Sequence, residues 1–461
     1  DGKPVTVAAS LEELVANLEK PARIMLLVPA GKIVDMVLAD LVPLLQKDDI
    51  VIDGGNSHFT DTDRRYTQLQ ASGIHFMGMG VSGGEEGARF GPSMMPGSNE
   101  QSFNAVKDIL ESIAAKTPEG ACVSFIGNGA AGHYTKMVHN GIEYAMMQLI
   151  SEVYGLLKNV AGLSNEELQQ TFAAWNNSEL QGFLIEITAE VFLQQDDKTG
   201  NFLVDMILDK AKQKGTGMWT SQSAMELNIP IPVIDAAVSM RYLSAMKEER
   251  VAAAGEYAAR EKDAIINKEE LVHICKNALH FAFILSYAQG LHLLHEASKA
   301  YAYNVNPAEV VRIWKGGCII RSALLNDLHQ AYLEDNAVSN VIHSPVFIST
   351  LKELRESTAD LCITGINNKL PVAAFAASLN YFDAYCSERL PANLAHAAAP
   401  QERQRLEARV NDLRRFRCGW RPMIHASPQI AAQDRPTEKP KRWSRRQAGA
   451  AASGGRTYRM R

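Results

Sequence analysis

The first part of the chain alternates short apolar runs with helical patterns. Continuous apolar runs predict buried strands at 23–28, 50–53, 74–78 and 122–127. Amphipathic helices are expected between them, up to about residue 46, over 61–71 and near 99–115. Buried strands that alternate with helices are typical of a mainly parallel sheet with crossover connections. We therefore predict an α/β domain over residues 1–128.

After about residue 129 the pattern changes to long helical segments. Helices are predicted over 129–158, 165–177, 179–195, 201–214, 231–262, 268–303, 307–316, 318–335, 345–362 and 371–386. The segment 268–303 is apolar on most sides, as expected for a buried central helix. The pattern indicates a large all-α domain over residues 129–394, followed by a basic low-complexity tail over 395–461.

Composition narrows the class of protein. The 461 residues are 46% hydrophobic and 21% charged, which is ordinary for a globular protein. We find no run of about 18 apolar residues and no export leader, so we expect a cytoplasmic protein without a membrane span or membrane partner. None of the six cysteines forms a C-x-x-C pair, and His292 and His295 lack partners at metal spacing. We expect reduced thiols and no metal site.

The charge is unevenly distributed. Residues 401–461 hold 16 Lys and Arg against 5 Asp and Glu, a net charge of +11, whereas the preceding 400 residues carry −16. The tail has little apolar periodicity beyond about Arg417, so we predict disorder. A solvated extension is favoured, and binding to nucleic acid is kept as a minor alternative.

Small residues follow three predicted strands. These loops are Val28-Pro29-Ala30-Gly31, Gly54-Gly55-Asn56-Ser57 and Val81-Ser82-Gly83-Gly84. Ligands of open α/β sheets bind beyond the carboxyl ends of the strands, so the loops suggest a dinucleotide or an anionic substrate. The G-x-G-x-x-G fingerprint is absent from residues 1–60, and we expect the nucleotide-binding domain to be incomplete.

Residues 132–148, GHYTKMVHNGIEYAMMQ, carry a polar stripe on an otherwise apolar helix. Lys136, His139, Asn140, Glu143 and Tyr144 fall at i, i+3, i+4, i+7 and i+8, which places them on one face. A lysine with a lowered pKa can act as a base, and a glutamate two turns away can move a proton at an adjacent carbon. A solvated helix face is the alternative, but exposed faces favour Glu, Lys, Gln and Ala.

Two further segments offer cations for a phosphate. Lys214-Gly215-Thr216-Gly217 combines an amine, a hydroxyl and accessible backbone amides. Arg241, on a later predicted helix, has a guanidinium that suits the same anion. An ordinary glycine turn and a surface arginine are the alternatives.

Together these segments resemble the 6-phosphogluconate dehydrogenase family over about residues 20–394. The matching segments, in the order of the family, are IVIDGGNSHFTDT, GVSGGEEGARFGPSMMPG, GHYTKMVHNGIEYAMMQL, KGTGMWTSQSA, SYAQG, GCIIRSALL and LPANL. The resemblance implies a Rossmann-like domain followed by an all-α substrate and dimerisation domain. It also implies oxidative decarboxylation of 6-phosphogluconate to ribulose 5-phosphate and CO2 with reduction of NADP, in the oxidative pentose phosphate pathway, by a homodimer.

The resemblance also implies roles for individual residues. Lys136 would be the base on the C3 hydroxyl and Glu143 the acid that protonates the enediol. The other implied substrate contacts are Ser82, Gly83 and Gly84 for the carboxylate, Asn56, His139 and Asn140 for hydroxyls, and Tyr144, Lys214, Thr216 and Arg241 for the phosphate. The implied contacts to the nicotinamide of NADP are Val28, Pro29, Ala30 and Asn56.

The chain departs from the family pattern at three places. The N-terminal glycine-rich turn is absent, Pro29 stands where the family often has lysine, and the residues after LPANL (390–394) do not match. We attribute the tail to a reading-frame or splice difference. The alternative function is a truncated, catalytically impaired dimerising paralogue that binds a phosphosugar acid but not NADP. We accordingly predict poor NADP binding, since lost charge-assisted hydrogen bonds are worth about 1.5–3 kcal/mol each.

Overall fold

The computed structural model describes residues 5–257 and 267–397, and the predicted disordered tail lies largely outside them. The chain divides into two compact units, one ending at Glu388 and one beginning at Arg389. In the second unit the described secondary structure is a short helix, α19 (Ala392–Ala397).

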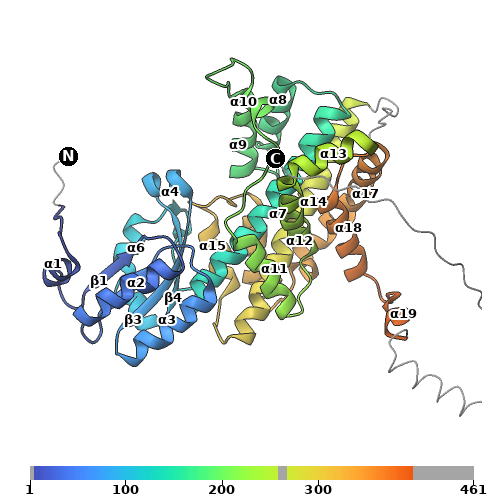
Figure 1. Cartoon of the computed structure of the whole chain (residues 1–461). Coiled ribbons are helices and arrows are strands. Elements are labelled where there is room, and N and C mark those ends of the chain that lie inside the picture. Colours follow the sequence, from blue (N-terminus) through green and yellow to red (C-terminus); the bar gives the residue numbers. More distant parts are fainter. Residues whose placement is uncertain (1–4, 258–266, 398–461) are drawn as a thin grey trace, which may run out of the picture. The chain divides into compact units, whose positions relative to one another are not determined.

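A five-stranded sheet organises the first part of the chain (Figure 1). Its strands, in spatial order, are β1 (Arg23–Leu26), β2 (Ile50–Asp53), β3 (His75–Ser82), β4 (Ser93–Ser98) and β7 (Gly127–Asn128). The pairs β1–β2, β2–β3 and β4–β7 are parallel, whereas β3–β4 is antiparallel. The α/β fold is thus confirmed, with one antiparallel pair that the sequence analysis did not predict.

Short helices accompany the sheet, and some differ from the predictions. They are α1 (Leu11–Ala16), α2 (Lys32–Leu41), η1 (Val42–Leu44), α3 (Phe59–Ala71), α4 (Gly84–Phe90), α5 (Glu100–Asn104) and α6 (Lys107–Ile113). The single helix predicted near 99–115 is two helices, because the chain turns between Asn104 and Lys107. The strand predicted over 122–127 is wrong for most of its length, since only Gly127 belongs to a strand there, β7, and Val123 forms an isolated bridge to Met94. The hairpin of β5 (Lys116–Thr117) with β6 (Gly120–Ala121) precedes it.

The remainder of the first unit is helical, as predicted. Its elements are α7 (Ala131–Asn159), α8 (Asn165–Trp175), α9 (Phe183–Leu193), α10 (Leu203–Met206), α11 (Thr216–Glu226), α12 (Pro232–Ala245), α13 (Lys247–Tyr257), α14 (Lys268–Ala300), α15 (Pro307–Trp314), α16 (Leu324–Glu334), η2 (Val341–His343), α17 (Pro345–Asn367) and α18 (Ala373–Tyr385). The helix predicted over 201–214 is reduced to α10, and Ile207 and Leu208 are exposed. The helix predicted over 318–335 begins only at Leu324.

Local sequence explains several helix ends. Ser164 and Glu167 form a reciprocal capping box at the start of α8. Proline occupies the first turn of α12, α15 and α17, where its missing N–H costs nothing. Asn267 accepts hydrogen bonds from the first turn of α14. These signals fix where the long helices begin.

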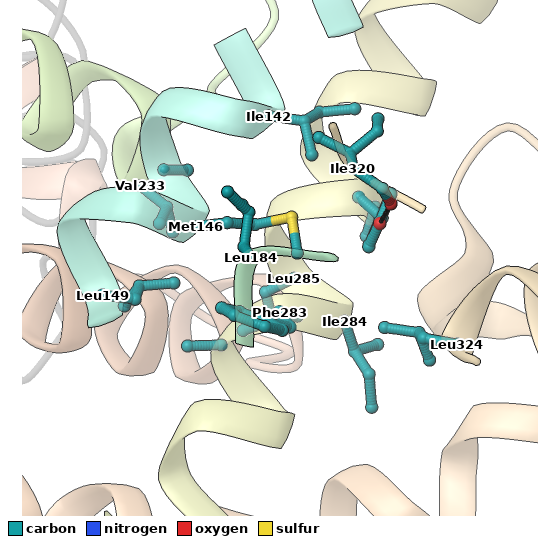
Figure 2. Close-up of a cluster of buried hydrophobic side chains, with 14 of the residues drawn as sticks. Ile142, Met146, Leu149, Leu184, Val233, Phe283, Ile284, Leu285, Ile320 and Leu324 are labelled. Carbon is teal, nitrogen blue, oxygen red and sulfur yellow. Dashed lines mark hydrogen bonds between the residues drawn. The ribbon is translucent and has the colours of Figure 1, made fainter. Parts of the chain in front are cut away.

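Two long helices, α7 and α14, form the centre of the helical core and pack against each other. Figure 2 shows part of this core, where the labelled side chains come from α7, α9, α12, α14 and α16 and the segment before α16: Ile142, Met146, Leu149, Leu184, Val233, Phe283, Ile284, Leu285, Ile320 and Leu324. By length and composition α14 is apolar enough to cross a membrane, contrary to the sequence expectation. However, 67% of its apolar window is buried inside the protein. This burial is typical of a central core helix.

Candidate active site

Helix α7 begins against the sheet, and glycines allow the close approach (Figure 1). A Cβ on Gly80 of β3 would lie 2.4 Å from Cβ of Lys136, and one on Gly97 of β4 would lie 2.2 Å from N of Gly132. A Cβ on Gly132 would lie 2.3 Å from the carbonyl oxygen of Gly78. The backbone of α7 therefore lies directly on β3 and β4. This contact fixes the position of the polar face of α7 relative to the sheet.

Lys136 supplies the amine of this face and is buried. Only 6% of the residue is exposed, and its Nζ lies 3.4 Å from Nδ1 of His139. Burial lowers the pKa of Lys136 from 10.5 to about 8, although the negative charge of Glu143 opposes the change. A substantial fraction of the amine is therefore neutral near physiological pH, as a general base requires.

His139 connects α7 to the end of β3. Its Nε2 lies 3.2 Å from Oγ of Ser82, and its Nδ1 lies 3.2 Å from Oδ1 of Asn140. The imidazole ring and the indole of Trp314 form a T-shaped pair, with ring centroids 5.5 Å apart. Burial and the charge of Lys136 lower the pKa of His139 well below its usual value, so the imidazole is neutral.

Glu143 lies one turn further along the same face. Its Oε2 is 3.8 Å from Nδ1 of His139. Burial raises the pKa of Glu143, and the charges of Lys136, Arg241 and Lys214 only partly oppose this rise. A carboxyl group with a raised pKa can hold a proton and deliver it, which suits a general acid.

Next to Glu143 on α7, Tyr144 lies against two cationic residues from other segments, Arg241 and Lys214. The guanidinium of Arg241, on α12, lies 3.8 Å above the ring of Tyr144. The backbone N of Lys214 lies 3.4 Å from the hydroxyl oxygen of Tyr144, and buried Thr216 begins α11. A Cβ on Gly217 would lie 2.5 Å from the Tyr144 ring. The structure thus brings together the four residues predicted to bind phosphate.

The strand-end loops lie along one edge of the sheet. The backbone N of Gly54 donates to the carbonyl oxygen of Leu26, and a Cβ on Gly55 would lie 3.3 Å from the carbonyl oxygen of Val28. The loops after β1 and β2 are therefore in direct contact. Pro29, Ala30 and Asn56 are exposed on them.

Beyond the end of β2, strand β3 continues from Gly78 to Ser82, and Gly83 and Gly84 follow it at the start of α4. Both glycines have positive φ, +124° and +57°, and a Cβ on Gly83 would lie 2.6 Å from the carbonyl oxygen of Gly317. The loop predicted to hold the substrate carboxylate is therefore packed backbone to backbone against the segment before α16.

The residues that support this face were not predicted from the sequence. Trp314, fully buried, donates from Nε1 to Sδ of Met95. His133, one turn before Lys136, places Nδ1 2.7 Å from Oγ1 of Thr62. Gly78 and Gly80 did offer a sequence signal for the close contact between α7 and β3, because residues two apart lie on one face of a strand. No comparable signal marked Trp314.

Among residues 5–257 and 267–397, no group of three His, Cys, Asp or Glu side chains converges as metal ligands. The five described cysteines, which exclude Cys418, are free thiols.

Comparison with known proteins places this arrangement in one family. The family model for the "6-phosphogluconate dehydrogenase, C-terminal domain" matches residues 132–399, and that for the "NAD binding domain of 6-phosphogluconate dehydrogenase" matches residues 2–127. The decarboxylating 6-phosphogluconate dehydrogenase of Synechococcus elongatus is 50% identical over 399 residues, which cover 86% of this chain and 85% of that protein. The NADP(+)-dependent decarboxylating enzyme of Bacillus subtilis is 48% identical over 397 residues, covering 86% of this chain and 85% of that protein.

A solved structure agrees with these relatives. The 6-phosphogluconate dehydrogenase of Plasmodium falciparum, described with its cofactor NADP+ and its substrate 6-phosphogluconate, superimposes with a TM-score of 0.82. It is 40% identical, and the match covers 84% of each chain. The chain belongs to the 6-phosphogluconate dehydrogenase family.

Proposed function

We propose that this protein catalyses the oxidative decarboxylation of 6-phosphogluconate to ribulose 5-phosphate and CO2 with reduction of NADP. The observation that carries the proposal is the single face of α7 on which buried Lys136 and partly buried Glu143 lie on either side of His139. The relatives favour this function over a non-catalytic phosphosugar-binding paralogue.

Substrate binding is proposed to follow the length of α7. Ser82, Gly83 and Gly84 would hold the carboxylate, because their backbone and hydroxyl lie at the end of β3 beside His139. Asn56, His139 and Asn140 would hold hydroxyl groups. The phosphate would lie at the opposite end, against Tyr144, Lys214, Thr216 and Arg241, where a bidentate guanidinium suits a phosphate.

The proton transfers follow from the two pKa changes. Neutral Lys136 would take the proton of the C3 hydroxyl while a hydride leaves C3, which gives a β-keto acid and an ammonium group. The ammonium, held in a buried site, would then stabilise the negative charge that develops on the C3 oxygen as CO2 leaves. Protonated Glu143 would deliver its proton to the enediol carbon, completing the product.

The residues at the sheet edge fit the nicotinamide end of NADP. The backbone beyond β1 and β2 is accessible, since Pro29, Ala30 and Asn56 are exposed and Gly54 and Gly55 carry no side chain. When bound, NADP supplies the hydride acceptor. Val28, Pro29, Ala30 and Asn56 would hold its nicotinamide near C3 of the substrate.

We also propose a cytoplasmic homodimer, as the sequence resemblance implied. Light scattering at several protein concentrations would test the assembly, and a monomeric mass at all concentrations would contradict it.

Steady-state formation of NADPH, together with trapping of released CO2, tests the activity. The acidic limb of kcat/KM against pH should lie near pH 8, because Lys136 must lose its proton before it can act. Lys136→Arg keeps the positive charge but cannot act as a base, so kcat should fall about 10²–10⁴-fold. Absence of NADPH formation by the unaltered protein with 6-phosphogluconate would refute the proposal.

A further inference from the structure

A buried arginine lies beneath the loops assigned to the nicotinamide. Arg65, on α3, is fully buried, and 1% of its side chain is exposed. Its Nη2 donates to the carbonyl oxygen of Gly31 at 2.9 Å, and its Nε donates to Oδ1 of Asp35 at 2.8 Å. Both partners belong to the segment after β1, so these hydrogen bonds fix the position of that segment relative to α3.

The same guanidinium reaches the loop after β2. Its Nη1 lies 3.5 Å from Oγ of Ser57 and 3.7 Å from Oδ2 of Asp53. Fully buried Asp53 in turn accepts hydrogen bonds from Oγ of Ser57 at 2.6 Å and from N of Gly55 at 3.0 Å. One planar cation thus binds both loops at once.

Charge and shape explain why an arginine fits here. A buried cation requires compensating acceptors, and Arg65 has Asp53 and Asp35 together with a carbonyl and a hydroxyl. Its fork directs donors to two loops simultaneously, which the single ammonium of a lysine does not reproduce. The hydrogen bond from Arg65 also lowers the pKa of Asp35 to about 2.

We propose that Arg65 is a positioning residue that sets the separation of the loops 28–31 and 54–57, and thereby the width of the nicotinamide site. It acts through Gly31, Ser57 and Asp53 and does not itself contact the substrate. The inference rests on the proposed function, because the two loops are assigned to the nicotinamide there. Of the residues proposed to bind the substrate, Asn56 lies on the loop 54–57 and the others lie on other elements. Arg65 therefore affects substrate binding through one contact and the nicotinamide site through both loops.

The test compares Arg65→Lys with Arg64→Lys. The neighbouring Arg64 is 43% exposed and pairs with Asp35 and Asp61, so its replacement makes the same chemical change at the surface. NADPH binding by fluorescence titration and 6-phosphogluconate binding by calorimetry are measured separately, with the KM values for both substrates. We expect Arg65→Lys to raise the Kd for NADPH and the KM for NADP about tenfold or more, equivalent to about 1.4 kcal/mol. The Kd for 6-phosphogluconate should change less than about twofold, and Arg64→Lys should change neither constant.

A purely structural role would weaken the binding of both ligands together. Equal losses of affinity for NADPH and 6-phosphogluconate would therefore overturn the proposal, as would unchanged NADPH binding. If Arg65→Lys does not fold, Asp35→Asn removes a partly exposed partner of the guanidinium and should reproduce the selective loss of NADPH affinity in smaller measure. An Asp35→Asn protein that binds both ligands like the unaltered protein would then overturn the proposal. Failure of the proposed function is recognised independently, since the unaltered protein would then form no NADPH.

Discussion

Replacing Lys136 by methionine should make the protein more stable at neutral pH while abolishing its proposed activity. Methionine has a similar length and no charge, so it fills the same space without requiring solvation. A pKa lowered from 10.5 to about 8 means that burial disfavours the charged amine by roughly 3 kcal/mol, at about 1.4 kcal/mol per pH unit. Loss of the contact to His139 should cost about 1 kcal/mol. The net gain should be about 1–3 kcal/mol.

The pH dependence of this gain is specific. Because the pKa of Lys136 is lowered in the folded protein, the folded state loses its proton first as pH rises. The unaltered protein should therefore recover stability between about pH 8 and pH 10.5, and the advantage of Lys136→Met should shrink over that window. Below pH 8 the advantage should be complete.

Urea unfolding at pH 6.5, 8 and 9.5, at one protein concentration, measures the difference. The control is Lys107→Met on α6, where 47% of the lysine side chain is exposed and the charge is solvated. The control should change the free energy of unfolding by less than about 0.5 kcal/mol at each pH. A Lys136→Met protein that is less stable at pH 6.5, or whose gain does not vary with pH, would refute the reasoning.

Two further predictions concern the contact between β3 and α7 and the C-terminal half of α7. Gly80→Ala should destabilise the protein by about 1–3 kcal/mol in urea unfolding, because its Cβ would lie 2.4 Å from Cβ of Lys136. Gly155→Ala on α7 should instead stabilise the protein by up to about 1 kcal/mol in the same assay, because nothing lies within 4 Å of the added Cβ. Buried Glu152 accepts hydrogen bonds from N of Ala374 and Phe375, and burial raises its pKa to about 7. The stability that comes with a raised carboxyl pKa is present below about pH 4.5 and is lost as the pH rises through 7. Between pH 5 and 7.5, the free energy of unfolding measured in urea should therefore fall by about 2 kcal/mol more for the unaltered protein than for Glu152→Gln. Parallel pH profiles of the two proteins would contradict this.

The sequence predicted α7 and its polar face because helical periodicity persists over many residues there. It did not predict β4, whose sequence SMMPGS contains Pro96 and Gly97, residues that disfavour strands. It assigned a strand to 122–127 because the run is apolar, but Cys122, Val123 and Ile126 are buried through packing with little strand pairing. Apolar content alone does not distinguish these two kinds of burial.

The candidate site was predicted by residue type and resemblance, whereas its support was not. The contacts of Arg65 join residues far apart in sequence, up to 34 positions for Gly31, and no local periodicity marks such pairs. The domain boundaries at 128 and 394 and the weak binding of NADP stay predictions. The roles of the individual site residues stay proposals.

The glycine contacts between the start of α7 and strands β3 and β4 limit how far the helix can move relative to the sheet. With backbone atoms of Gly132 against Gly78 and Gly97, the helix has no compressible side-chain layer on which to slide over the strands. Hinge closure of the sheet upon α7 would have to separate these backbones. Entry and exit of small molecules should therefore depend on the peripheral segments, such as the stretch between α10 and α11, while Lys136 and Glu143, the proposed base and acid, keep a fixed spacing on α7.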